Sequence, residues 1–139
     1  MTHAVSTAQI RVRYAETDQM GVAHHANYLI WCEQARTDHM RALGVNYRDL
    51  EKSGMGLPVI DVSVRYRAPA YYDDLLDVRC WVRGTSSRVV EFGYAVERDA
   101  MLLATAATTL VAVDPNRAVQ RIPTEIRELL IAIPDPVRL

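Results

Sequence analysis

The chain has 139 residues, of which half are apolar and about a quarter are charged. This composition is typical of one globular domain spanning residues 1–139 and argues against disordered, collagen-like or low-complexity chains. With 16 basic against 17 acidic residues and a net charge of -1, we expect no nucleic-acid-binding surface, although a local basic patch can still hold a phosphorylated ligand.

The first predicted elements are a strand and the longest helix of the chain. Apolar residues alternate with arginines over residues 9–14, which is the period of a half-buried strand. After a polar loop, apolar residues recur at three- and four-residue steps, which predicts a helix over 26–43 that ends at Gly44. A shorter helix is predicted over 47–52.

The second half of the chain has the two-residue period of strands rich in β-branched and aromatic residues. The predicted strands are 59–66, 75–82, 89–96 and 102–113. Turn-forming residues separate them, and the Arg98-Asp99 connection is short enough for a hairpin. A last weak helix is predicted to begin near Pro123.

The order of the elements is strand, long helix, then a run of strands. This segregation favours an α+β fold in which an antiparallel five-stranded sheet covers one helix, over alternating parallel units. A single helix cannot cover five strands, and the sheet has two edges that need protection. Pairing with a second copy of the chain meets both needs, so a homo-oligomer is predicted.

The two cysteines and the apolar segments bear on the cellular compartment. Cys32 and Cys80 follow no C-x-x-C spacing and are too few for a disulfide framework, so we interpret them as buried thiols in a reducing compartment. No secretory signal is visible. The most apolar run, 101–113, has 13 residues and three threonines, and is too short and polar to span a bilayer. A cytoplasmic protein without membrane insertion is predicted.

Residues 14–28, YAETDQMGVAHHANY, place a carboxylate, a glycine and two histidines before the long helix. The unpaired N–H groups of a helix start can hold a carbonyl oxygen as it becomes an oxyanion, and each such donor is worth ~3 to 4 kcal/mol. Asp18 could attack that carbonyl or activate water, and Gly21 would let the backbone approach. Spacing alone equally fits a turn-forming Asp18 and a His25 without a role.

The stretch YAETDQMGVAHHANYLIWCEQART resembles the signature loop and helix of the 4-hydroxybenzoyl-CoA thioesterase family of hot-dog-fold proteins. Within that family, it is most similar to the acyl-CoA thioesterases associated with the Tol-Pal system. The later YRAPAYYDDLLDV is similar to the family's second recurring segment, in which a strand ends in a Pro-containing turn and an acidic residue opens the next strand. The resemblance implies a hot-dog fold, with a sheet wrapped around one central helix, and active sites at the subunit interface of a homodimer or homotetramer.

The resemblance also implies roles for individual residues. Asp18 matches the catalytic carboxylate, which acts as nucleophile or as general base. Gly21 matches the loop glycine, and His25 matches the helix start whose backbone N–H polarises the thioester carbonyl. Asn27 and Tyr28 complete the matching stretch.

Further residues are candidates for substrate binding. Glu33 stands where related enzymes line the acyl pocket, although a local ion pair with Arg36 explains it equally well. A CoA thioester carries phosphates, for which Arg65, Arg67 and Arg88 are the candidate partners. Each of these arginines can equally be an exposed, solvated side chain.

The predicted reaction is hydrolysis of an acyl-CoA thioester to the free acid and CoA, without a metal or redox cofactor. The histidines follow no H-E-x-x-H pattern, and no G-x-S-x-G elbow occurs. The main alternative is a non-catalytic acyl-CoA or acyl-carrier-protein binding or sensor module of the same fold, and a structural oligomerisation protein is a third. A sensor needs no carboxylate, so Asp18 favours the enzyme. The acyl chain and its carrier, CoA or acyl carrier protein, stay open.

Overall fold

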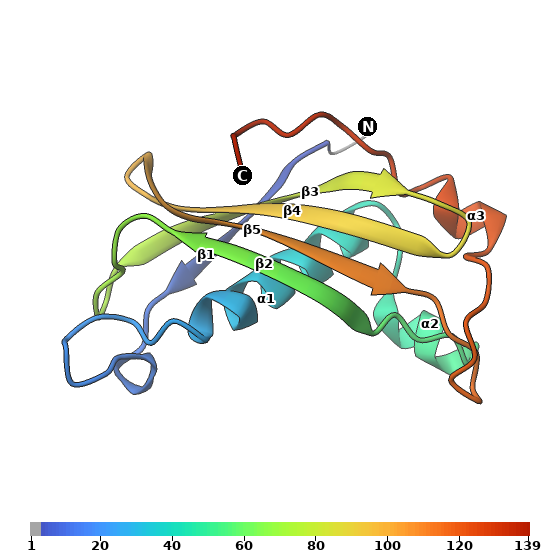
Figure 1. Cartoon of the computed structure of the whole chain (residues 1–139), viewed down its shortest axis with the longest axis horizontal. Helices are drawn as coiled ribbons and strands as arrows, with labels where there is room; N and C mark the ends of the chain where they lie inside the picture. Colours follow the sequence, from blue (N-terminus) through green and yellow to red (C-terminus); the bar gives the residue numbers. More distant parts are fainter. Residues whose placement is uncertain (1–3) are drawn as a thin grey trace.

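The structure of the chain is a computed structural model, which describes residues 4–139. One antiparallel five-stranded sheet lies over a long helix, and two short helices lie at one end of the sheet (Figure 1). In chain order the elements are β1 (Ser6–Arg11), the 3-10 turn η1 (Tyr14–Glu16), α1 (Asn27–Ala42), α2 (Tyr47–Lys52), β2 (Val59–Tyr66), β3 (Leu75–Thr85), β4 (Val89–Arg98), β5 (Met101–Val111) and α3 (Thr124–Arg127). The predicted α+β hot-dog fold is confirmed.

The strand order in the sheet is β1-β3-β4-β5-β2, with every neighbouring pair antiparallel. The predicted hairpin is formed by β4 and β5, with Arg98 paired to Met101. Asp99 and Ala100 both have positive φ, 50° and 66°, which is the conformation that a tight two-residue hairpin turn requires. Strands β1 and β2, distant in order from each other, form the two edges of the sheet.

The first strand differs from its prediction, which covered 9–14. The observed strand runs from Ser6 to Arg11, because the chain turns into η1 immediately afterwards. Val12 still pairs with the segment before β3, since its N–H donates to the Asp74 carbonyl at 2.9 Å. Of residues 12–14, which lie beyond the strand, only Val12 is buried, whereas Tyr14 is 77% exposed, so the alternation of apolar residues with arginines extended past the end of the strand.

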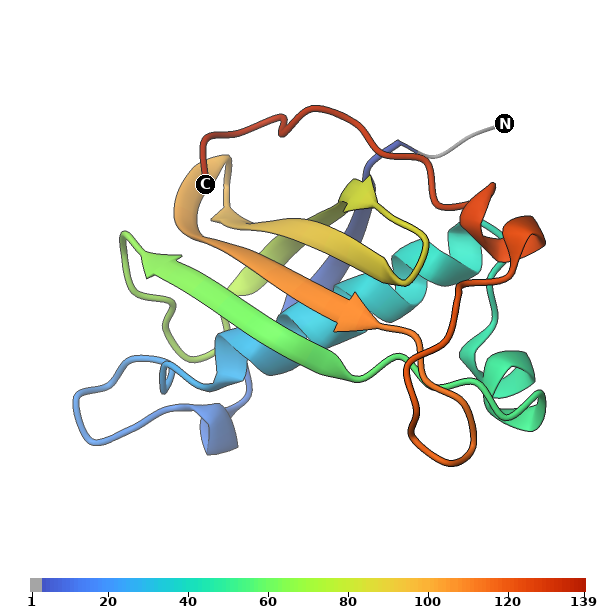
Figure 2. The same ribbon diagram turned by 45° about the vertical axis from the view of Figure 1, so that its right-hand side comes forward.

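Helix α1 crosses the concave face of the sheet and packs on β1, β3 and β4 (Figure 2). Its buried face includes Trp31, Cys32, Ala35 and Met40, each at most 2% exposed, which meet the apolar residues of the sheet's inner face. This burial is the main favourable term of the fold. Strand β2 lies beyond the helix and stays largely exposed, with Val62 at 44%.

The C-terminal segment runs over the opposite face of the sheet from α1 (Figure 1). Ile133 N–H donates to the Val82 carbonyl at 3.0 Å. Asp135 then accepts hydrogen bonds from the Trp81 indole N–H at 2.9 Å and from two nitrogens of Arg83 at 3.0 Å each. Burial opposes the charge of Asp135, but the Arg83 and Trp81 bonds outweigh it and lower the pKa of the carboxyl group. No pattern in the sequence predicted these contacts.

Both cysteines are buried and unbonded to each other, as predicted. Burial raises the pKa of Cys32 to about 12 and the pKa of Cys80 well above its ordinary value. Within residues 4–139, no helix is both long and apolar enough to span a membrane, and no three side chains of His, Cys, Asp or Glu gather where they could hold a metal ion.

Candidate active site

The loop between η1 and α1, residues 17–26, places Asp18 at an exposed turn. An antiparallel bridge joins Thr17 to Ala23 at the base of the loop. The Asp18 carboxylate accepts the Met20 N–H at 2.8 Å, and the Asp18 carbonyl accepts the Gly21 N–H at 3.0 Å. Gly21 has φ +80° with open space around it, so glycine is needed here for its backbone conformation rather than for close packing.

Glu16, which the sequence analysis did not single out, anchors both ends of this loop. Its buried carboxylate, 5% exposed, accepts the Arg13 N–H at 2.8 Å and the Trp31 indole N–H at 3.0 Å. Its carbonyl accepts the His24 N–H at 2.7 Å and the Asn27 side-chain amide at 2.9 Å. Burial opposes the charge, but the Arg13 and Trp31 hydrogen bonds outweigh it and lower the pKa of the carboxyl group. Asn27 therefore ties the helix start to the loop.

Helix α1 begins with a tightened turn in which each N–H reaches back three residues. Asn27 donates to the His24 carbonyl at 3.0 Å, Tyr28 to His25 at 3.4 Å, and Leu29 to Ala26 at 3.2 Å. The N–H groups of His25 and Ala26 donate to no acceptor within residues 4–139. Such groups point off the N-terminal end of a helix, where the helix dipole adds positive potential. They can therefore stabilise an oxyanion.

A pocket of about 280 Å³ lies beside this helix start, between α1 and the chain that follows β2. Its lining residues are Ala23, His25, Tyr28, Tyr66, Arg67, Ala68 and Pro69. The Tyr66 hydroxyl donates to the His25 carbonyl at 2.8 Å, and the Tyr28 hydroxyl accepts the Ala70 N–H at 3.1 Å. The pocket thus joins the two sequence segments that carry the family resemblance, although they are about 40 residues apart.

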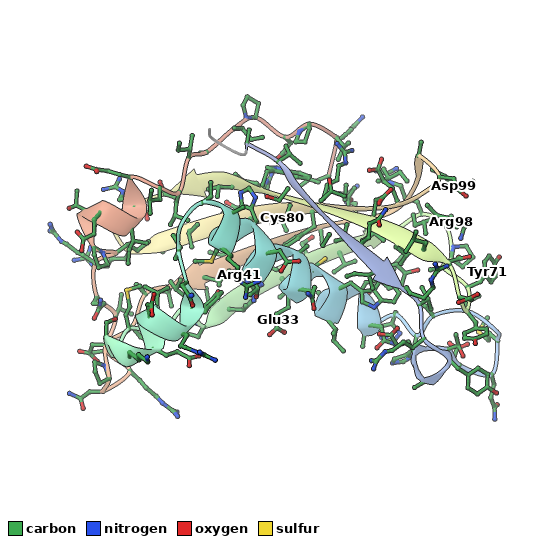
Figure 3. The ribbon with its side chains drawn as sticks, turned by 180° about the vertical axis from the view of Figure 1, so that it is seen from behind. Glu33, Arg41, Tyr71, Cys80, Arg98 and Asp99 are labelled. Atoms are coloured by element: carbon green, nitrogen blue, oxygen red, sulfur yellow. The ribbon has the colours of Figure 1, made fainter. Side chains whose placement is uncertain are left out.

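The far wall of the pocket belongs to residues 67–74, which we call the proline turn. Asp74 accepts the Tyr71 N–H at 2.8 Å and Arg98 Nη1 at 2.7 Å. The same Arg98 nitrogen donates to the Pro69 carbonyl at 3.1 Å, and the guanidinium lies 5.6 Å from the centre of the Tyr71 ring (Figure 3). The β4–β5 hairpin therefore holds the proline turn in place, and Asp74 is the acidic residue that opens β3.

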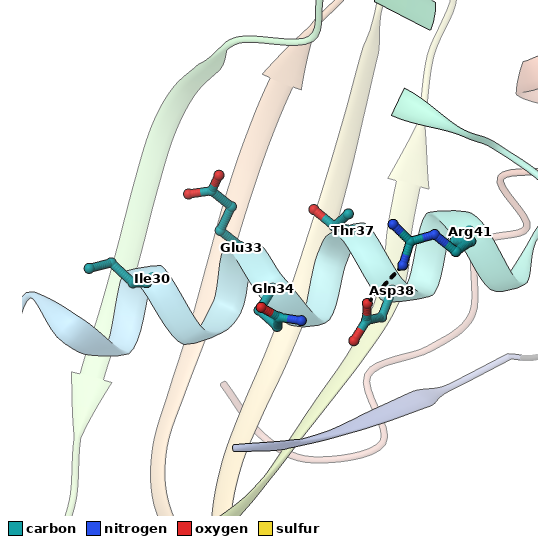
Figure 4. Close-up of a pocket in the computed structure, with 6 residues that line it drawn as sticks. All are labelled: Ile30, Glu33, Gln34, Thr37, Asp38 and Arg41. Atoms are coloured by element: carbon teal, nitrogen blue, oxygen red, sulfur yellow. Dashed lines mark hydrogen bonds and ion pairs between the residues drawn. The ribbon is translucent and has the colours of Figure 1, made fainter. Parts of the chain in front are cut away.

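Glu33 lies apart from this pocket, on the exposed face of α1. It lines a shallow polar hollow of about 390 Å³ together with Thr37 and Arg41, and Arg41 pairs with Asp38 at 3.3 Å (Figure 4). The alternative explanation of Glu33 as an ion-pair partner of Arg36 is wrong. Arg36 is buried and donates to the Tyr94 hydroxyl at 3.2 Å instead.

The three candidate arginines occupy different places. Arg67 lines the pocket, and Arg65 is exposed two residues earlier on β2. Arg88 is exposed next to the β3–β4 turn and donates to the Ser87 hydroxyl at 3.3 Å. The register places this turn at the same end of the sheet as the start of β2, with β5 between them. Arg88 is therefore at least the length of β2, roughly 25 Å, from the end where Arg67 lies.

Comparisons with known proteins agree with this architecture. The model of the family described as the thioesterase-like superfamily matches residues 12–130. YneP of Bacillus subtilis, named as a candidate acyl-CoA thioesterase, is 41% identical over 105 residues, which cover 76% of each chain. The acyl-CoA thioester hydrolase YbgC of Escherichia coli is 35% identical over 109 residues, covering 76% of this chain and 80% of YbgC. The crystal structure of a DHNA-CoA thioesterase from Staphylococcus aureus has a TM-score of 0.87 and 33% identity, covering 90% of this chain and 87% of that chain.

Proposed function

The chain belongs to the thioesterase-like superfamily, and on that premise we propose that it hydrolyses an acyl-CoA thioester to the free acid and CoA. It is an enzyme of the thioester hydrolase class. The observation that carries the proposal is the helix start itself. Two adjacent backbone N–H groups, of His25 and Ala26, have no acceptor within residues 4–139, and they adjoin a pocket and the loop that holds Asp18.

In the proposed reaction the thioester carbonyl binds at the N-terminal end of α1. Its oxygen becomes negative as the tetrahedral intermediate forms, and the backbone N–H groups of His25 and Ala26 stabilise that charge. The C–S bond then breaks, and CoA leaves as a thiolate that takes up a proton. No metal or redox cofactor takes part in the proposed steps.

Asp18 supplies the nucleophile or the general base. Within the described chain its carboxylate accepts only the Met20 N–H, so it can meet a substrate without breaking an ion pair. As a nucleophile it attacks the carbonyl carbon and forms an anhydride, which water then hydrolyses. As a general base it takes a proton from the attacking water. The side chain of His25, which lines the pocket, contributes to positioning substrate or water in either route.

Substrate binding involves both sequence segments and, in this proposal, a second subunit. Tyr28 and Arg67 line the pocket, and Arg65 is exposed on β2, the strand that ends at the pocket residue Tyr66. Arg88 lies at the other end of the sheet, and Glu33 lies outside the pocket. In this proposal, Arg88 and Glu33 contact only a substrate that is bound in the pocket of another subunit.

The proposed assembly is a homodimer formed through β2. This edge strand exposes Val59, Ile60 and Val62 at 41%, 59% and 44%, and its backbone lacks a neighbour on one side. Exposed apolar edge strands are sites of pairing between chains. We also propose that the chain belongs to the 4-hydroxybenzoyl-CoA thioesterase family, within its Tol-Pal-associated branch. A cytoplasmic location is proposed as well, and two free cysteines fit it.

The experiment is thiol release from short-chain, long-chain and aromatic acyl-CoA thioesters by the wild-type protein and by Asp18→Asn. We expect the wild type to hydrolyse at least one thioester and Asp18→Asn to lose about 100-fold or more in kcat. Asp38→Asn is the matched control, because Asp38 is a carboxylate on the outer face of α1, and it should retain full activity. Binding without hydrolysis by the wild type would reject the enzyme and favour a sensor. Full activity of Asp18→Asn would remove Asp18 from the mechanism.

A further inference from the structure

Tyr66, the last residue of β2, reaches from the sheet to the first turn of α1. Its hydroxyl donates a hydrogen bond of 2.8 Å to the His25 carbonyl. Its ring stands edge-on to the Tyr28 ring, with centroids 5.0 Å apart and an interplanar angle of 90°. Tyr66 is the first residue of the second segment that carries the resemblance, but the sequence assigned it no role.

The His25 carbonyl depends on this hydrogen bond. In a regular helix it would accept the N–H four residues later, that of Leu29, but Leu29 donates to Ala26 instead. The remaining backbone donor is Tyr28, at 3.4 Å, which is at the long end of hydrogen-bond distances. The Tyr66 hydroxyl is therefore the stronger of the two partners that orient this carbonyl.

The carbonyl and the next N–H belong to one rigid unit. The peptide bond between His25 and Ala26 is planar and trans, so the direction of the His25 C=O fixes the direction of the Ala26 N–H. The preceding peptide is held separately, because its carbonyl, that of His24, accepts the Asn27 N–H at 3.0 Å. The direction of the His25 N–H is thus fixed by the hydrogen bond from Asn27 to the His24 carbonyl. The direction of the Ala26 N–H is fixed by the hydrogen bond from Tyr66 to the His25 carbonyl.

Tyr66 is itself held firmly enough to act as a restraint. Its strand pairs it with Ala104 of β5. Directly afterwards, the N–H groups of Arg67 and Ala68 both donate to the Leu103 carbonyl, at 2.8 and 3.1 Å. Partial burial raises the pKa of Tyr66, so the hydroxyl keeps its proton and stays a donor at neutral pH.

We propose that Tyr66 is a positioning residue for thioester hydrolysis: its hydroxyl fixes the His25–Ala26 peptide, so that the Ala26 N–H joins the His25 N–H as a second oxyanion donor. The inference rests on the proposed function, because it assigns a role within the same site. Tyr66 acts through the peptide and exchanges no proton with the substrate. Its contribution therefore increases as negative charge develops on the carbonyl oxygen, and it contributes little to binding of the uncharged ground state.

The test compares Tyr66→Phe, which removes only the hydroxyl, with Tyr72→Phe. Tyr72 is 57% exposed, and within residues 4–139 its hydroxyl makes no hydrogen bond. With the best thioester of the wild type, we expect kcat of Tyr66→Phe to fall about 10- to 100-fold while KM changes less than about twofold. Affinity for an S-alkyl-CoA thioether, which has no carbonyl to polarise, should stay the same. Tyr72→Phe should match the wild type in every measurement.

Three outcomes would overturn the inference. An unchanged kcat for Tyr66→Phe would show that the hydroxyl does not orient the donors. A higher KM with unchanged kcat would make Tyr66 a substrate contact instead. A loss of kcat accompanied by an equal loss of thioether affinity, or by a changed oligomeric state in sedimentation, would make its role structural. The proposed function fails in a different way, namely if the wild-type protein hydrolyses no thioester at all.

Discussion

Replacing Glu16 by Gln should destabilise the protein, because this buried carboxylate accepts two short hydrogen bonds and also pairs with the Arg13 guanidinium at 3.4 Å. One carboxylate oxygen accepts the Arg13 N–H at 2.8 Å and the other accepts the Trp31 indole N–H at 3.0 Å. A glutamine amide offers one oxygen and one NH₂ group, so one of the two donors would face another donor. Leaving one buried donor unsatisfied costs about 1 to 3 kcal/mol.

For a domain of this size, that loss lowers the melting temperature by about 3 to 9 °C. The assay is thermal unfolding followed by circular dichroism at fixed protein concentration, because oligomerisation makes the melting temperature depend on concentration. Glu33→Gln is the control. Glu33 is an exposed acid of the same chain, and its substitution should change stability by less than about 0.5 kcal/mol.

The effect should also depend on pH in a defined direction. Because the folded state lowers the pKa of Glu16 below its ordinary value of 4.5, the charged carboxylate stabilises the folded state above the unfolded-state pKa. This contribution is lost as the pH falls through the lower, folded-state value. The difference in stability between the wild type and Glu16→Gln should therefore be full at pH 7 and shrink below about pH 4.5. Equal melting temperatures for Glu16→Gln and Glu33→Gln at pH 7 would show that the hydrogen bonds of the Glu16 carboxylate do not stabilise the fold.

Two further predictions concern the core. In Gly93→Ala, the new Cβ would meet the buried Trp81 ring at 2.6 to 2.7 Å, so we expect the free energy of unfolding in urea to fall by about 1 to 3 kcal/mol. Gly84→Ala is the control, because a Cβ at this position has open space around it. Equal losses of stability in the two variants would contradict the steric argument. Cys32 and Cys80 are buried thiols with raised pKa values. A colourimetric thiol reagent should therefore label neither cysteine in the native protein and both after unfolding. Rapid labelling of either thiol in the native protein would contradict their burial.

Most of the elements could be predicted from the sequence, because their hydrophobic periods are long and clear. The predicted helices over 26–43 and 47–52 correspond to α1 and α2, and the strand over 59–66 corresponds to β2. The residue at which β1 ends could not be predicted from the hydrophobic period. Val12 lies beyond the strand but is fully buried, and its alternation with arginines continues the pattern of a strand. The hydrophobic period indicates which residues are buried, but it does not indicate which part of the chain covers them.

The candidate site was predictable only in part, because its contacts join residues distant in sequence. The motif at the helix start predicts Asp18, Gly21 and His25 as site residues, but it does not show that the backbone N–H groups of His25 and Ala26 lack acceptors within residues 4–139. Tyr66 lies 41 residues after His25, and only the strand order places it at the helix start. The partner of Arg36 also could not be predicted from the sequence. Its position three residues after Glu33 fits a surface ion pair, but in the structure Arg36 is buried and donates to the Tyr94 hydroxyl.

A crystal structure of Asp18→Asn with an uncleaved acyl-CoA would show whether the thioester carbonyl binds at the N-terminal end of α1. We expect the thioester oxygen within about 2.7 to 3.2 Å of the backbone nitrogen of His25 or Ala26, with residue 18 facing the carbonyl carbon or a water beside it. A thioester bound elsewhere, such as in the hollow lined by Glu33 and Arg41, with the helix start empty, would contradict it.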